Sequence, residues 1–139
     1  LALDDFRRAL KINPSHSIAK SNMRAFNKSI DSAETASLDS LIATAPQLPY
    51  GYAERAYQRL QQKNYAGALE DYHQAIKLSP ATAEYYLNRG LVYEKLKQTS
   101  LAYQDYTKAL VLREDFAMAW LNRGNVLLSL RKYTEAIQD

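Results

Sequence analysis

Apolar and small residues recur along the chain at the spacing of a single helix face. One stripe comprises Tyr86, Leu87, Gly90, Leu91 and Tyr93, and a second comprises Ala102, Tyr106, Ala109 and Leu110. Recurrence at three- and four-residue intervals predicts amphipathic helices. Because the two stripes follow one another closely, the pattern predicts pairs of helices and an all-α fold.

The stripes return with a fixed period of 34 residues. Residues 86–90 and 120–124 agree at four of five positions, with tyrosine exchanged for tryptophan at the first, and residues 52–56 fall in the same register. We call positions that lie 34 residues apart a column. Other columns are Ala68 with Ala102 and Ala136, Tyr72 with Tyr106, Ala75 with Ala109, and Asp71 with Asp105 and Asp139. Such a period is typical of stacked helical hairpins, which bury a core only against their neighbours.

These columns resemble the tetratricopeptide repeat, in which a bulky aromatic residue, a small residue, a small-to-aromatic pair and a proline recur. The matching residues are Tyr52, Ala56, Ala68, Tyr72, Ala75 and Pro80, then Tyr86, Gly90, Tyr93, Ala102, Tyr106 and Ala109, then Trp120, Gly124 and Ala136. Glu114 stands where the second unit would have its proline. The resemblance implies a TPR-like α-solenoid, a right-handed superhelix of antiparallel helix hairpins.

We interpret the chain as one solenoid fragment of five segments. Residues 1–14, with Ala2, Phe6, Ala9 and Pro14, are the second helix of a truncated repeat; 15–48 is a degenerate repeat; 49–82 and 83–116 are regular repeats; and 117–139 is a truncated repeat. Turns inside the repeats are expected near Lys63–Asn64, Gln98–Thr99 and Arg131–Lys132.

Composition supports a folded chain without metal or redox chemistry. Hydrophobic residues make up 47% and charged residues 24% of 139 residues, which is the balance of an ordinary globular domain. Cysteine is absent, so disulfides and thiolate zinc sites are excluded. The 18 basic and 15 acidic residues are interleaved, as on a solvated surface. No apolar run approaches the ~18 residues of a membrane span, and we expect a cytoplasmic location with no membrane partner.

The resemblance implies that the first helix of each repeat lines a concave groove that holds a partner protein. The groove candidates are Tyr50, Ala53, Glu54, Tyr57, Gln61, Glu84, Leu87, Asn88, Leu91, Lys95, Met118, Leu121, Asn122 and Asn125. The amides of Asn88 and Asn122 could bond a peptide backbone, or they could serve only local polar contacts. One subclass of the family clamps the C-terminal carboxylate of chaperones with lysine, arginine and asparagine. Asn88 matches that asparagine, but Ala53 and Met118 occupy cationic places, so this specificity is not expected.

An arginine column, Arg55, Arg89 and Arg123, accompanies the aspartate column Asp71, Asp105 and Asp139. Guanidinium groups could form a ladder for anions. A periodic pair of opposite charges more often ties helices of a repeat protein together. We therefore favour structural ion pairs.

Nothing in the sequence predicts catalysis. His16 and His73 lie in different units without a second ligand at metal-binding spacing, and there is neither a nucleophile elbow nor a glycine-rich phosphate loop. We expect no enzyme activity, no metal and no cofactor.

The sequence thus predicts a protein–protein interaction scaffold, with two alternatives. The first is self-assembly, in which a stripe of Leu127, Leu130, Tyr133 and Ile137 packs on residues 2–10 of another copy. The second is single-stranded RNA binding, as in a related helical family with a period near 35 residues. Glu54 and Glu84 on the expected inner face disfavour it, so no nucleic acid is expected.

Overall fold

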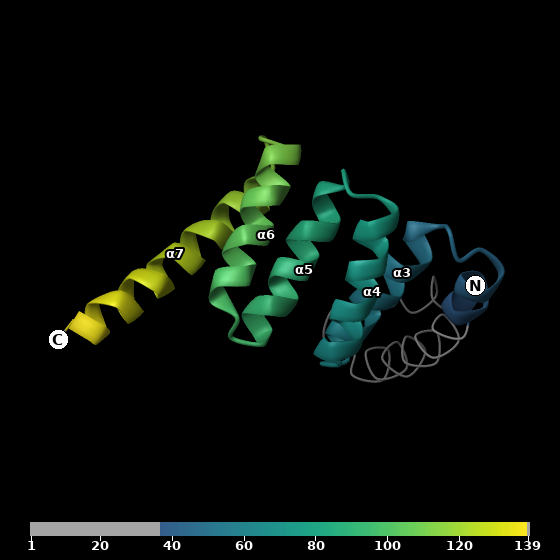
Figure 1. Cartoon of the computed structure of the whole chain (residues 1–139), viewed down its shortest axis with the longest axis horizontal. Helices are drawn as coiled ribbons and strands as arrows, with labels where there is room; N and C mark the ends of the chain where they lie inside the picture. The colour runs from purple at the N-terminus through teal and green to yellow at the C-terminus, as the bar shows by residue number, and fades with distance from the viewer. Residues whose placement is uncertain (1–36, 139) are drawn as a thin grey trace, which may run out of the picture. The chain divides into compact units, whose positions relative to one another are not determined.

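The computed structural model describes residues 37–138, with the backbone alone for residues 132, 133 and 135–138. Residues 37–44 are helical, and a compact unit begins at Leu38 and includes the helices that follow. The helices that follow are α3 (Pro49–Gln61), α4 (Tyr65–Leu78), α5 (Ala83–Lys95), α6 (Thr99–Leu112) and α7 (Ala117–Gln138), shown in Figure 1. The described part of the chain contains no strand.

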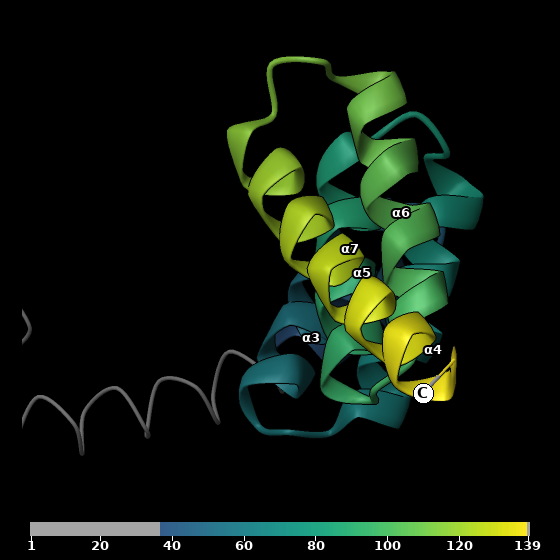
Figure 2. The same ribbon diagram turned by 90° about the vertical axis from the view of Figure 1, so that its left-hand side faces the viewer.

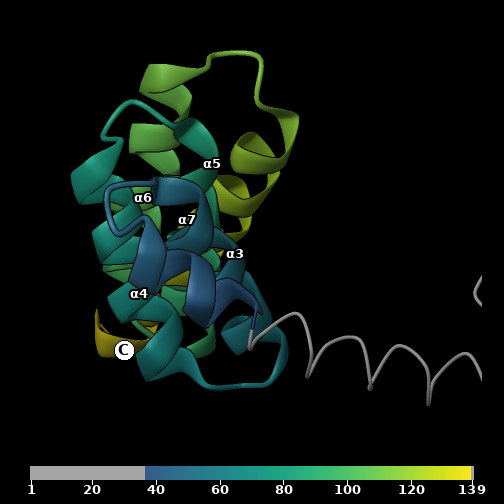
Figure 3. The ribbon, with the colours of Figure 1, turned by 90° about the vertical axis from the view of Figure 1, so that its right-hand side faces the viewer.

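The helices stack in chain order as antiparallel hairpins. Each contacts the next along the chain, from α3 to α7. Seen from the two ends of the stack, α3, α5 and α7 form one layer and α4 and α6 the other (Figures 2 and 3). The all-α, TPR-like solenoid fold expected from the columns is therefore confirmed.

The helix ends follow from local residues. Pro49 opens α3, where its missing N–H costs nothing, and the Asn64 side chain caps α4 by accepting from the Gly67 N–H at 3.1 Å. The turns inside both hairpins place a lysine, Lys63 or Lys97, at a left-handed φ of 61°. These lysines share a column, so one backbone turn is used twice.

Small residues let the helices approach. Ala68, Ala75, Ala102 and Ala109 of the second helices are completely buried. At Gly90 of α5, a Cβ would lie 2.6 Å from Cε1 of Tyr106 in α6, which is closer than real atoms allow. The aromatic ring thus occupies the space that the missing side chain leaves, and the columns of small and aromatic residues explain the core.

Helix α7 corrects two expectations. It runs unbroken for 22 residues through Arg131 and Lys132, so the turn expected there is wrong. Each residue that continues a helix adds a hydrogen bond, whereas a new helix must first form a costly nucleus. Leu130 packs against the core and is not part of an exposed stripe, while Leu127 is exposed. The side chains of Tyr133 and Ile137 lie outside the described residues.

No helix in residues 37–138 combines the length and the apolar character needed to cross a membrane.

Candidate functional site

The exposed large apolar side chains gather on the first helices of the repeats. Tyr50 and Tyr57 of α3 are 60% and 49% exposed, and Met118 and Leu121 of α7 are 53% and 60% exposed. All four belong to columns predicted to face a partner. We call the side of α3, α5 and α7 that carries these columns the first-helix face. Side chains of this size in water form a surface suited to another molecule.

The middle helix contributes less to this face than expected. Leu87 of α5 is only 7% exposed and belongs to the core cluster that also holds Ala119 and Val126 of α7. Leu91 packs against the same cluster. Leu87 therefore lies in the core and not on a binding surface, because α5 has a neighbour on each side. Ala53 of α3 is also buried.

Two carboxylates make one part of the face acidic. Glu84 is exposed and accepts a hydrogen bond from Arg113, whereas the half-buried Glu54 has no ion pair with any residue in 37–138. Burial raises the pKa of Tyr85, and the charges of Glu54 and Glu84 raise it further. Toward the other end of the helices, Lys95, Gln61 and Asn125 are exposed.

The two asparagines of interest, Asn88 and Asn122, lie beside buried tyrosine hydroxyls. Burial raises the pKa of Tyr72, and the nearby Asn88 amide opposes that rise. Burial and Glu94 raise the pKa of Tyr106, which Asn122 opposes in the same way. Oη of Tyr72 and Nδ2 of Asn122 are buried without a hydrogen-bond partner. Each asparagine is therefore partly engaged with the core and only half-exposed.

The arginine and aspartate columns meet inside each hairpin. Nε and Nη2 of Arg55 donate to the two carboxylate oxygens of Asp71 at 2.9 and 2.7 Å, and the same atoms of Arg89 bond Asp105 at 2.8 and 2.7 Å. Both aspartates are buried. The hydrogen bonds that Arg55 donates to Asp71 raise the pKa of Arg55 despite its partial burial. The guanidinium groups of Arg55 and Arg89 are therefore already paired with carboxylates. Each pair joins the first helix of a hairpin to its second helix.

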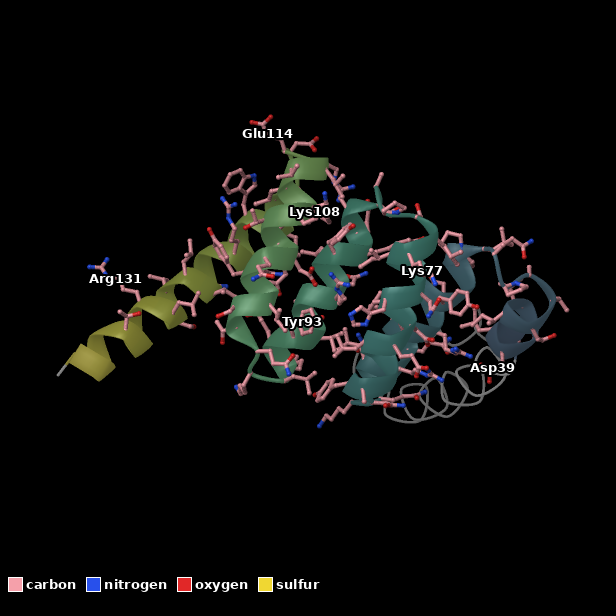
Figure 4. The ribbon with its side chains drawn as sticks, viewed as in Figure 1. Asp39, Lys77, Tyr93, Lys108, Glu114 and Arg131 are labelled. Atoms are coloured by element: carbon pink, nitrogen blue, oxygen red, sulfur yellow. The ribbon has the colours of Figure 1, made fainter. Side chains whose placement is uncertain are left out.

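Sequence reasoning missed two members of this network, Arg59 and Asp39. Arg59 makes a second ion pair with Asp71 at 2.9 Å. Asp39, which is labelled in Figure 4, accepts from Nη1 of Arg55 at 2.7 Å. Neither has a charged equivalent in the next unit, so no column indicated them. Arg123 differs from both other arginines: its Nη1 lies 3.5 Å from Oγ1 of Thr107, and Asp139 lies outside the described residues.

Comparison with known families agrees with this architecture. Models of the tetratricopeptide repeat match residues 56–97, 83–116 and 100–139, which together span more than half of the chain. The chain belongs to the tetratricopeptide repeat family. Domains of this family are protein–protein interaction modules. No curated protein matches the chain.

Solved tetratricopeptide repeat structures share the fold at low sequence identity. The first such domain of Spaghetti (RPAP3), bound to the HSP90 peptide SRMEEVD, is 20% identical with a TM-score of 0.72 and covers 81% of this chain and 89% of its own. MamA is 18% identical with a TM-score of 0.71, and the match covers 98% of this chain and 81% of MamA. The second domain of human RPAP3, in complex with the HSP70 peptide SGPTIEEVD, is 23% identical with a TM-score of 0.67. The match covers 73% of this chain and 84% of that domain.

Other features of this tetratricopeptide repeat chain lie away from the first-helix face. His73 is exposed on α4, with Nε2 at 3.4 Å from the Tyr93 hydroxyl, and His16 lies outside the described residues. Within residues 37–138 no three metal-ligating side chains cluster. An open surface hollow of about 560 Å³ between the α5–α6 turn and α7 was not predicted; it is lined by Lys97, Gln98, Thr99, Ser100, Leu101 and Leu130.

Proposed function

We propose that the first-helix face binds a linear segment of a partner protein. The observation that supports this most is the set of half-exposed apolar side chains on the first-helix face of α3 and α7: Tyr50, Tyr57, Met118 and Leu121. A folded monomer gains nothing by holding four such side chains in water, and each Å² of apolar surface covered by a partner contributes about 25 cal/mol. Rigid helices hold these anchors in place before the partner arrives.

Polar groups beside the anchors can orient that segment. The exposed amides of Asn125 and Gln61 can donate to and accept from a peptide backbone. Asn88 and Asn122 reach the face only in part, since both lie beside tyrosine hydroxyls. We therefore assign the main contact to the apolar anchors and a supporting role to the amides.

The charge of the face disfavours acidic partners. The peptides bound by the two RPAP3 domains, SRMEEVD and SGPTIEEVD, both end in acidic residues. This chain instead carries Ala53 and Met118 where the clamp resemblance requires cations, and Glu54 and Glu84 lie on the same face. Like charges repel most strongly where water is excluded. We expect a neutral or basic segment with apolar side chains to be the ligand.

A phage-displayed library of random linear peptides tests this function. We expect binding to the intact chain to be lost in Tyr57→Ala/Leu121→Ala and kept in the control Val111→Ser, because Val111 is an equally apolar, exposed residue on the second helix α6. We also expect the synthetic peptide SRMEEVD to bind at least ten times more weakly than the selected peptides. Failure to select any peptide, or equal loss in the control, would contradict the proposal.

A further inference from the structure

A carboxylate and two tyrosine rings lie together on the first-helix face, where α3 meets α5. Glu54 and Tyr57 are three residues apart on α3 and therefore share one side of that helix. Tyr85 and Asn88 have the same spacing on α5, which contacts α3. Burial raises the pKa of Tyr85 most, and the charge of Glu54 is the next cause, so the Glu54 carboxylate lies near that ring. We call Glu54, Tyr57, Tyr85 and Asn88 the Glu54 cluster.

A buried hydroxyl group without a partner borders the Glu54 cluster. Tyr72 of α4 is completely buried and packs with Ala56 of α3 and Val92 of α5, so its ring reaches between those two helices. Burial raises the pKa of Tyr72, and the charge of Glu54 raises it further, which places the hydroxyl near that carboxylate. Within residues 37–138, Oη of Tyr72 has no hydrogen-bond partner. Because an unpaired buried hydroxyl is costly, it indicates that a further polar group belongs at this place.

The negative charge of the cluster is also unanswered. Within residues 37–138, the half-buried Glu54 forms no ion pair, and no cation stacks on Tyr57 or Tyr85. Glu84, the other carboxylate of this part of the face, is already paired with Arg113. A carboxylate that is partly withdrawn from water is stabilised by a nearby cation. The Glu54 cluster is therefore complementary to a positive group that comes from outside.

The chain itself shows how such groups hold a guanidinium. Arg89 bonds both oxygens of Asp105 at 2.8 and 2.7 Å, and its Cζ lies 5.7 Å from the ring centres of both Tyr86 and Tyr93. Cations within about 6 Å of a ring centre are attracted to the ring face. One carboxylate and two tyrosines thus accompany this guanidinium, and the Glu54 cluster offers the same groups to a partner.

We propose that the Glu54 cluster binds an arginine side chain of the partner segment. The Glu54 carboxylate accepts from the guanidinium, and the rings of Tyr57 and Tyr85 flank it. The amide oxygen of Asn88 accepts a further N–H, which leaves the NH2 group of Asn88 to donate to the Tyr72 hydroxyl. Arginine suits these groups better than lysine, because its planar fork carries five donors and stacks on aromatic rings. The inference rests on the proposed function and names what the linear segment must contain: an arginine beside its apolar residues.

Titration of the full chain with N-acetyl-arginine amide, followed by NMR of the tyrosine rings, tests the cluster without any peptide. We expect saturable shifts at Tyr57 and Tyr85 with millimolar affinity. The neutral analogue N-acetyl-citrulline amide should bind at least tenfold more weakly at the same ionic strength, because it brings no charge to Glu54. N-acetyl-lysine amide should bind at least threefold more weakly, because an ammonium group does not stack on the rings.

Two variants with matched chemistry identify the carboxylate. Glu54→Gln keeps the shape of the side chain and should weaken binding of the arginine amide at least tenfold. Glu70→Gln neutralises an exposed carboxylate on the second helix α4 and should bind like the unchanged chain. Thermal unfolding of both variants shows whether either is misfolded. The comparison of arginine with citrulline uses the unchanged chain, so it decides the proposal even if a variant is unstable.

The outcomes separate this inference from the proposed function. Absence of saturable shifts, equal binding of the citrulline amide, or undiminished binding by a folded Glu54→Gln would each overturn the inference, and equal binding of the lysine amide would overturn the assignment to arginine. Selected peptides that lack arginine would contradict the inference and leave the proposed function intact. Arginine binding at the cluster without any selected peptide would contradict the proposed function alone.

Discussion

The hairpins α3–α4 and α5–α6 share their backbone turn and their columns but fill the space between helices differently. Tyr72 in the first hairpin packs with Ala56, and its hydroxyl has no partner. Tyr106 in the second packs on Gly90 and bonds Glu94, where the first hairpin has Leu60.

The buried aspartates differ in the same way. Among the described side chains, Asp71 binds two arginines, Arg55 and Arg59, whereas Asp105 binds only Arg89. The first hairpin therefore has a redundant ion pair and an unsatisfied hydroxyl, and the second has a single ion pair and a satisfied one. The comparison teaches that the 34-residue period specifies the arrangement of the helices. The partners of the buried hydroxyls and carboxylates, by contrast, depend on residues that differ between the hairpins.

The largest difference should appear when the arginines are removed. Arg89→Ala leaves the buried Asp105 without an ion-pair partner, and we expect the free energy of unfolding to fall by about 3 kcal/mol. Arg55→Ala leaves Asp71 with Arg59 at 2.9 Å, so the loss should be smaller, about 1 kcal/mol, from packing and one weaker contact. Urea denaturation of both variants measures the difference. Equal losses would show that Arg59 does not replace Arg55.

Removal of the tyrosine hydroxyls should give a smaller effect that differs between the two hairpins. Tyr106→Phe removes a hydrogen bond to a carboxylate and should destabilise the chain by about 1.5 kcal/mol. Tyr72→Phe removes a buried hydroxyl that has no partner, so we expect no loss or a small gain in stability. Thermal and urea unfolding of the two variants provide the measurement.

The pH dependence of the free energy of unfolding offers a second test of the buried hydroxyls of Tyr72 and Tyr106. Burial raises the pKa of both Tyr72 and Tyr106 above the unfolded value of about 10. A raised pKa means that the unfolded chain releases its phenolic protons first, so stability is complete below pH ~10 and decreases as pH rises above it. Each phenylalanine variant should flatten this alkaline decrease. An unchanged slope in both would show that neither hydroxyl is buried in solution.

The period made most of the fold predictable, whereas the exposure of individual side chains was not. Stripes and columns predicted the hairpins, and the arginine and aspartate columns pointed to residues that do meet. Columns could not show that Leu87 is buried while Leu121, one period later, is 60% exposed. The difference in exposure depends on which helices pack around α5 and α7. Residues in the same column do not reveal those neighbours. The unbroken course of α7 through Arg131 was also missed, because the repeat period predicts a turn there and the local residues do not stop the helix.

The smallest expected effect tests how closely the second hairpin is packed. Gly90→Ala should gain about 1 kcal/mol from helix propensity and lose somewhat more, because the new Cβ would lie 2.6 Å from the Tyr106 ring. The net loss should be about 0.5–1 kcal/mol by urea denaturation. Gly124→Ala provides the matched control and should show the propensity gain alone, since no atom lies within 4 Å. Ala56 already holds a methyl group in the same column beside Tyr72. If Gly90→Ala stabilised the chain as much as Gly124→Ala, the second hairpin would be able to relax to the helix spacing of the first. Packing would then not require glycine at position 90.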